Sequence, residues 1–225
     1  MTFTLDSVAP WGRTMDEYAA MFALSDYDLD SIILGCADGP ASFNAEMHAQ
    51  GRHVVSVDPV YQFTGEQIRS QVDATFPTIM EQLHQNLDDY VWTRIPSPET
   101  LQKQRMNAME KFFADFHVGK QEGRYQPHEL PRLPFADQEF DLAVCSHFLF
   151  LYSDQLSADF HCQAVRELTR VAREVRIFPL QSLDRRPSPH VDRVCEHISQ
   201  LGRDCEIKSV DYEFQRGANR MLNVR

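Results

Sequence analysis

The sequence predicts an α/β sandwich built around a mostly parallel β-sheet. Short β-branched, apolar runs alternate with stretches of helical periodicity, which is typical of strands joined by crossover helices. The 225-residue chain closes with two β-patterned segments, 205–214 and 219–225, separated by QRGA as in a hairpin. We expect a single domain over residues 1–225, long enough to bury a core, with a helical insertion at about 60–120.

The first elements are set by local signals. A capping box, Thr14 to Glu17, predicts a short helix that runs to about Ala23. A break at LSDYDLD precedes the first strand, which we expect to end at Leu34. A helix follows from about Pro40 to Ala49, with proline in its first turn, where no backbone N–H is missed. The β-branched run HVVSVDP is the second strand.

Residues 60–120 interrupt this alternation. They carry helical patterns at about 65–75, 77–91 and 98–117, separated by prolines. Because one crossover helix needs only about a dozen residues, we interpret the segment as an insertion of extra helices. A connection of this length in a compact fold usually covers a binding site or makes a partner surface.

The alternation resumes in the second half. We expect a strand and loop over 123–135 and a strongly buried strand, FDLAVCS, over 140–146. A helix at about 154–171, the strand EVRIFPL and a helix at about 189–201 complete the pattern before the terminal hairpin.

Composition and charge exclude several classes of function. The net charge is −11, and the first 60 residues hold nine acids against Arg13 and Arg52, so no basic stripe for nucleic acid is present. No run approaches the roughly 20 apolar residues that cross a membrane, and no signal peptide is recognisable. The five cysteines lack CxxC spacing and several sit in apolar runs, so we expect buried thiols, no zinc or other metal site and a location in a reducing cytoplasm.

Two glycines follow the first predicted strand, in the stretch SIILGCADGPASF. A strand-to-helix turn lets a ligand touch the backbone where Cβ atoms are missing, and the helix start adds N–H donors. Gly35 and Gly39 supply such positions, and Asp58 at the end of the second strand can accept both hydroxyls of an adenosine ribose. Alternatively, the glycines only make a tight turn and Asp58 caps a strand end.

A dinucleotide fits this turn poorly. The fingerprint GxGxxG asks for glycines at positions that here hold Ala37 and Pro40. The GKS or GKT of a P-loop is absent. NAD and ATP are therefore disfavoured, and an oxidoreductase on the same fold would have to bind NAD(P) despite these two residues.

Four segments together resemble the class I S-adenosylmethionine-dependent methyltransferases, in the family's order along the chain. They are IILGCADGPASF, VVSVDP, LPFADQEFDLAVCSHFLF and ELTRVAREVRIFPL. The resemblance covers roughly residues 10–60 and 124–225. It implies a three-layer Rossmann-like sandwich whose mostly parallel seven-stranded sheet ends in an antiparallel hairpin. It also implies S-adenosyl-L-methionine as the cofactor.

In this family the glycine loop faces the amino-acid end of the cofactor, and the acid after the second strand holds the ribose. The resemblance therefore implies cofactor contacts at Gly35, Asp38 and Gly39 of the loop. It assigns the ribose to Asp58, with Pro59 beside it.

Two further parts of the chain match family positions. The position that often supplies an acid to the adenine amino group falls on His128, and Glu129 beside it is the substitute. Residues just past the fourth strand line the methionine side and the substrate pocket in the family. Here they are Ser146, His147 and Phe148.

The chain departs from the family pattern at two positions. Ile33 replaces the acid that commonly reaches the methionine amino group, and Ala37 replaces the middle glycine, which is tolerated if its φ is negative. A buried ammonium needs a partner, and Asp38 is one replacement. Arg13 and Tyr18, in the helix before the loop, are candidates for holding the carboxylate end.

A catalytic base helps methyl transfer only if the acceptor carries a proton, because positioning supplies most of the catalysis in an in-line displacement. His147 is our candidate, since imidazole titrates near neutral pH and this position faces the predicted substrate entrance. The alternative is a histidine packed under the inserted helices. Tyr152 is a further candidate for the pocket.

The fourth strand does not end in an NPPY or DPPY motif, which argues against methylation of base amino groups in nucleic acid. The acidic net charge agrees with this, so we expect a small-molecule acceptor. Trp92 and phenylalanines of the insertion are candidates for covering a pocket. At helical spacing, however, Phe112, Phe113 and Phe116 fit better as the packing face of a helix.

Two hypotheses of different class remain. In the first, the chain is a methyltransferase that acts on an unidentified, small-molecule acceptor. In the second, it is a catalytically inactive S-adenosylmethionine-binding protein that uses the insertion as a partner surface, as Ile33 and Ala37 suggest. Both predict cofactor binding that depends on Asp58, and only the first predicts a methylated product.

Overall fold

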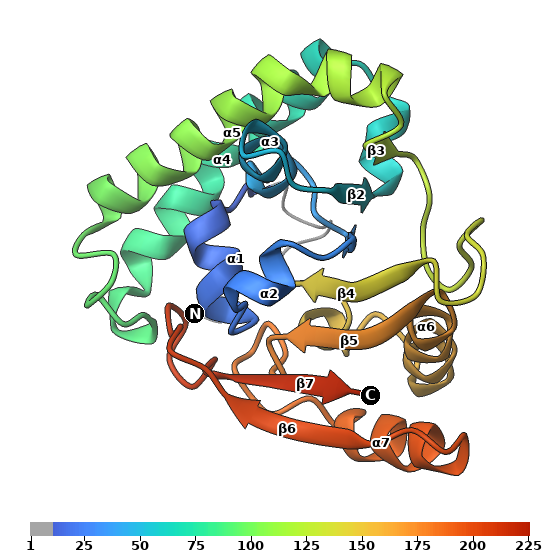
Figure 1. Cartoon of the computed structure of the whole chain (residues 1–225). Coiled ribbons are helices and arrows are strands. Elements are labelled where there is room, and N and C mark those ends of the chain that lie inside the picture. Colours follow the sequence, from blue (N-terminus) through green and yellow to red (C-terminus); the bar gives the residue numbers. More distant parts are fainter. Residues whose placement is uncertain (1–10) are drawn as a thin grey trace.

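The computed structural model describes residues 11–225, and its centre is a seven-stranded sheet (Figure 1). The strands are β1 (Ile33–Cys36), β2 (Val54–Val57), β3 (Tyr125–Gln126), β4 (Phe140–Ser146), β5 (Ala172–Phe178), β6 (Cys205–Ser209) and β7 (Arg220–Val224). Their order is β3-β2-β1-β4-β5-β7-β6. β7 runs antiparallel to both β5 and β6, and the other described pairs are parallel. This topology confirms the predicted fold, including the antiparallel end.

Helices cover both faces of this sheet. They are α1 (Met15–Met21), α2 (Asp26–Leu29), α3 (Phe43–Ala49), α4 (Gly65–Gln85), α5 (Pro98–Gln121), α6 (Ala158–Val171) and α7 (Val191–Gln200), with short 3₁₀ turns η1 (Pro59–Gln62), η2 (Leu87–Asp89) and η3 (Phe150–Tyr152). Leu142 and Val144 of β4 join the hydrophobic cluster under α1–α5, whereas Ala143 and Cys145 join the cluster under α6 and α7. The alternation follows from the two-residue period of a strand and gives three layers.

Local signals position the helix starts. The Thr14 side chain accepts the Glu17 N–H while the Glu17 side chain accepts the Thr14 N–H, so the predicted capping box is confirmed. Ser97 caps α5 in the same region where the sequence predicted a helix start. A further capping box, Ser25 with Asp28, starts α2 inside LSDYDLD, where we had predicted a break. Four residues are too few to show a helical period in the sequence.

The boundaries around the glycine turn differ from the prediction. β1 extends to Cys36 instead of ending at Leu34, because Gly35 and Cys36 keep pairing with β2 and β4. The next helix starts at Phe43, not at Pro40, so the turn is longer and proline stands outside the helix.

The insertion consists of two long helices, and Pro77 lies inside α4 instead of separating two helices. The buried face of α4 continues on both sides of it, at Phe76 and Ile79, so tertiary packing outweighs the local cost of proline. Phe112 and Phe116 of α5 are buried, which confirms them as packing residues.

The link between β6 and β7 is also longer than predicted. It spans residues 210–219 instead of the four residues QRGA, because β6 ends at Ser209. Within residues 11–225, no helix combines the length and apolar character needed to cross a membrane. The five cysteines are free thiols. Cys36, Cys145 and Cys162 are buried, as predicted, whereas Cys195 and Cys205 are only half-buried.

Candidate functional site

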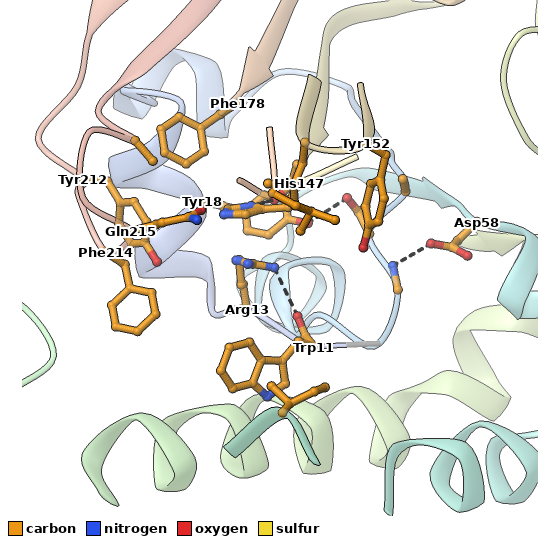
Figure 2. Close-up of a pocket in the computed structure, with 18 of the residues that line it drawn as sticks. Trp11, Arg13, Tyr18, Asp58, His147, Tyr152, Phe178, Tyr212, Phe214 and Gln215 are labelled. Atoms are coloured by element: carbon orange, nitrogen blue, oxygen red, sulfur yellow. Dashed lines mark hydrogen bonds between the residues drawn. The ribbon is translucent and has the colours of Figure 1, made fainter. Parts of the chain in front are cut away.

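A cavity of about 210 Å³ lies at the carboxyl ends of four neighbouring strands (Figure 2). Ala37 follows β1, Asp58 follows β2, His147 follows β4 and Phe178 ends β5, and all four line the cavity. Ligands of open parallel sheets bind in this crevice. Further walls come from the segment before α1 and from α1, from α4 and the link between α4 and α5, from η3, from the loop after β5, and from the β6–β7 loop.

The turn after β1 is shaped by the absence of a side chain at Gly35. A Cβ added there would lie 1.9 Å from Oδ2 of Asp38, so glycine leaves the space in which the Asp38 carboxylate folds back. Ala37 and Gly39 both have positive φ, 58° and 52°. The condition under which alanine would replace the middle glycine without strain, a negative φ, is therefore not met: Ala37 occupies a left-handed conformation that favours glycine.

Asp58 joins the turn to the second strand. Its Oδ2 accepts the Gly39 N–H at 2.9 Å, and its Oδ1 accepts the Val60 N–H at 2.9 Å. Burial raises the pKa of Asp58, although these two backbone hydrogen bonds act in the opposite direction. Each carboxylate oxygen has about two acceptor sites, so a bound ligand can still donate to both oxygens.

Asp38 is a second acid in the cavity wall and, unlike the half-buried Asp58, it is buried. Its carboxylate accepts the Tyr18 hydroxyl at 2.8 Å and the Ser56 hydroxyl at 2.7 Å. Burial raises the pKa of Asp38 to about 7, because the two hydroxyl donors compensate only part of the lost hydration. A cation at this position would find an acid ready to ionise.

Arg13 is the cationic side chain among the described residues that line the cavity. Arg13 was predicted to lie in the helix before the glycine turn, but it lies before Thr14, the cap of α1, and so outside the helix. Its guanidinium donates one hydrogen bond to the Trp11 carbonyl, at 3.3 Å. Its Nε atom is buried without a partner within residues 11–225. Burial and the nearby Arg105 lower the pKa of Arg13. An anionic ligand would relieve both the missing hydrogen bond and the like-charge repulsion.

His147 follows β4 in a left-handed conformation, with φ of 50°. Its N–H donates to the Phe178 carbonyl at 2.7 Å, and its Nδ1 lies 2.9 Å from Oγ of Ser146. Burial lowers the pKa of His147 well below its usual value, and the charges of Arg13 and Arg105 add to this effect. The imidazole is therefore neutral near pH 7.

Most of the predicted site residues meet at this cavity. They are Arg13, Tyr18, Asp38, Gly39, Asp58, Ser146, His147 and Tyr152. Their assembly follows from the topology, because adjacent parallel strands bring separate carboxyl ends to one edge of the sheet.

Five other candidates do not line the cavity. Gly35 lies within β1 and Pro59 begins η1 behind Asp58. His128 and Glu129 follow β3, and the Glu129 charge contributes to the raised pKa of Asp58. Phe148 packs in the cluster on the α6 side. The cofactor contacts assigned to these positions stay predictions.

The sequence did not point to the aromatic wall of the cavity. Tyr90, Tyr212 and Phe214 line it from two loops that are distant in the chain, and Trp11 and Phe178 complete it. We had expected Tyr212 and Phe214 inside a strand, so no motif could single them out. The expected cover, Trp92, instead packs behind Phe214, with ring centroids 5.5 Å apart.

The comparisons with known proteins give a distant likeness. No family model matches the chain. The uncharacterized protein MJ0045 of Methanocaldococcus jannaschii is 29% identical over 215 residues, which are 95% of this chain and 94% of that protein.

Similar solved structures include the magnesium protoporphyrin IX methyltransferase of Synechocystis PCC 6803 with bound S-adenosylmethionine. It is 11% identical, with a TM-score of 0.49, and the match covers 93% of this chain and 76% of that one. A second is the 1,6-didemethyltoxoflavin-N1-methyltransferase of Burkholderia thailandensis, at 12% identity and a TM-score of 0.47, over 93% and 79% of the two chains. The assignment of an activity to the present chain therefore rests on its own residues.

Proposed function

We propose that this chain binds S-adenosyl-L-methionine in the cavity and transfers its methyl group to a small-molecule acceptor. The observation that carries the proposal is the Asp58 carboxylate at the end of β2. It is anchored by the Gly39 and Val60 N–H groups and it lines the cavity. A carboxylate held in this way can accept the two hydroxyls of a ribose.

The residues beside Asp58 on the way to the middle of the cavity fit the amino-acid part of the cofactor. Arg13, whose buried Nε has no partner among the described residues, would hold the carboxylate. Asp38, oriented by Tyr18 and Ser56, would hold the ammonium. Ile33, at the position where the family often has an acid, is fully buried in β1. Asp38 is thus our replacement for that acid.

The cofactor, when bound, supplies an electrophilic methyl group on a sulfonium. The chain supplies position, exclusion of water and a proton acceptor. If Nδ1 of His147 donates its hydrogen to Ser146, Nε2 is left as an acceptor for a proton from the substrate. Because His147 is neutral near pH 7, it needs no prior deprotonation to act as a base.

Calorimetric titration with S-adenosylmethionine and with S-adenosylhomocysteine tests the binding step. We expect dissociation constants in the micromolar range, about −8 kcal/mol. Asp58→Ala should abolish this binding, whereas Asp73→Ala, which removes an exposed carboxylate from α4, should leave it unchanged. If the protein binds NAD but neither S-adenosylmethionine nor S-adenosylhomocysteine, the oxidoreductase alternative is supported and the proposal is contradicted.

The strained Ala37 favours the second candidate, a binding protein without transfer activity. Turnover separates the two candidates. The protein is incubated with S-adenosylmethionine and fractionated small-molecule extract, and mass spectrometry follows S-adenosylhomocysteine and products heavier by one methylene. If both products form with the wild type and are lost in His147→Gln, while that variant still binds the cofactor, the methyltransferase hypothesis is supported. Tight binding without product across all fractions supports the inactive protein.

A further inference from the structure

The cavity has two ends of different chemistry. Figure 2 shows Asp58 on one side and Tyr212 and Phe214 on the other, with His147 between them. The cofactor assigned above, on which this inference rests, uses the end with Asp58, Gly39 and the groups around Arg13. The aromatic end, defined here by Tyr90, Phe178, Tyr212, Phe214 and Gln215, is left for the acceptor.

The rings of this aromatic end stand at steep angles to one another. Phe178 and Tyr212 have centroids 5.7 Å apart and an interplanar angle of 83°, and His147 meets Phe178 at 5.4 Å and 64°. A flat ring that stacks on one such wall presents its edge to the next. Offset stacking and edge-to-face contact are the two favourable geometries of aromatic pairs.

The walls are held in place before a ligand arrives. The Tyr212 hydroxyl donates to the buried Glu17 carboxylate at 2.9 Å. Phe214 packs on Tyr90 with centroids 4.9 Å apart, and its carbonyl accepts the Val91 N–H at 2.7 Å. A rigid slot loses little entropy on binding and favours a rigid ligand.

The aromatic end carries no acidic or basic side chain among the described residues that line it. The charged groups of the lining are Arg13, Asp38 and Asp58, all of which the cofactor would use. The polar groups of the aromatic end are neutral. They are the Gln215 amide, the Tyr212 hydroxyl, which donates to Glu17, and the Tyr90 hydroxyl, whose pKa is raised to about 12 by burial and by Asp89. A charged acceptor would lose its hydration here without gaining an ionic partner.

We propose that the acceptor is an uncharged, planar aromatic or heteroaromatic molecule that stacks in the slot formed by Phe178, Tyr212 and Phe214. A hydroxyl or ring N–H on it would face His147, and the Gln215 amide would supply a second hydrogen bond. This end of the cavity thus selects the acceptor by shape and by the absence of charge.

Calorimetry with small probes tests this without any turnover. Naphthol, naphthoate, naphthylmethylammonium and the saturated, puckered decahydronaphthol are titrated into the protein, alone and with saturating S-adenosylhomocysteine. Naphthol should bind at least about tenfold more tightly than each of the other three, because they lack aromatic contacts or carry a charge. With S-adenosylhomocysteine bound, so that Arg13, Asp38 and Asp58 are occupied, equal or tighter binding of naphthoate, of the ammonium or of decahydronaphthol would overturn the proposal. No binding of naphthol at millimolar concentration would overturn it as well.

Variants localise the probe. Phe214→Leu keeps an apolar side chain and should weaken naphthol roughly fivefold by loss of one aromatic partner. Phe160→Leu, a matched change in α6 on the opposite face, should have no effect. Unchanged naphthol affinity in Phe214→Leu would contradict the assigned slot. Binding of S-adenosylhomocysteine is measured separately. A protein that binds naphthol but does not bind S-adenosylhomocysteine would refute the proposed cofactor and retain the proposed slot.

Discussion

Arg105 of α5 donates two hydrogen bonds to Glu17 of α1, at 2.5 and 2.7 Å, and both residues are fully buried. Burial raises the pKa of Glu17, but the charge and hydrogen bonds of Arg105 outweigh it and lower that pKa to about 2. Glu17 also accepts the Tyr212 hydroxyl. One carboxylate therefore joins the inserted helices, the first helix and the aromatic end of the cavity.

We expect Arg105→Met to lower the free energy of unfolding by about 3–5 kcal/mol, because it leaves the Glu17 charge buried without its partner. The double variant Glu17→Gln/Arg105→Met should recover most of this loss. Glutamine is neutral, and it can keep both the capping box with Thr14 and the hydrogen bond from Tyr212. Urea unfolding of the wild type and both variants measures the effect. A double variant as unstable as the single one would show that the charge is not the cause.

The raised pKa of Asp38 predicts pH-dependent cofactor binding. Only the ionised carboxylate can pair with an ammonium, so affinity for S-adenosylhomocysteine should rise roughly five- to tenfold from pH 6 to pH 7.5, as the ionised fraction rises. Calorimetry across this range measures it. Asp38→Asn should bind more weakly and without this pH dependence, and a persisting slope in that variant would assign the dependence to another group.

The same acid should destabilise the unliganded protein at high pH. Its folded pKa lies above that of an unfolded aspartate, so its protonated form favours folding, and this contribution is lost as the pH rises through about 7. We therefore expect Asp38→Asn to melt at a higher temperature than the wild type, by a margin that grows from pH 5 to pH 8. Thermal unfolding of Asp73→Asn, at an exposed position, provides the control.

Gly35→Ala should be destabilising and should weaken cofactor binding. The added Cβ would meet the Asp38 carboxylate at 1.9 Å and displace it from Tyr18 and Ser56. We expect a loss of about 1–3 kcal/mol in the free energy of unfolding, as for other overpacked sites.

Gly65→Ala is the matched control for this substitution. A Cβ there meets only Phe116, at an ordinary 3.7 Å, and the residue begins α4, where alanine is the better helix former. We expect its stability to be equal or higher. Equal stability and binding in Gly35→Ala would mean that the Asp38 carboxylate moves aside without consequence.

Much of the fold could be predicted because its signals are local or periodic. The capping box at Thr14 and the apolar run FDLAVCS each specify an element without reference to the rest of the chain. Asp58 could be identified as a candidate because it follows a strand at a set distance from the glycine turn, and the structure places it in the cavity wall. Parallel strands place such residues at one edge of the sheet.

Errors arose where packing outweighs local preference. Pro77 was expected to end a helix, but the continuous buried face of α4 keeps it inside. The sequence left open which φ Ala37 adopts; the structure gives a positive φ, with the Ala37 N–H bonded to the Val57 carbonyl at 2.9 Å and the Asp38 carboxylate folded back beside it. Short-range rules do not contain these contacts.

The sequence by itself determined the order of the main strands along the chain, the glycine turn and the acid that follows the second strand. Only the tertiary structure decided what surrounds them: that Arg105 pairs with Glu17, that Asp38 is buried between two hydroxyls, and that rings from two distant loops meet opposite Asp58. The physical reason is the distance along the chain over which each interaction acts. Capping and periodicity act over a few residues, whereas burial, charge pairing and ring packing depend on groups that only the folded chain brings together.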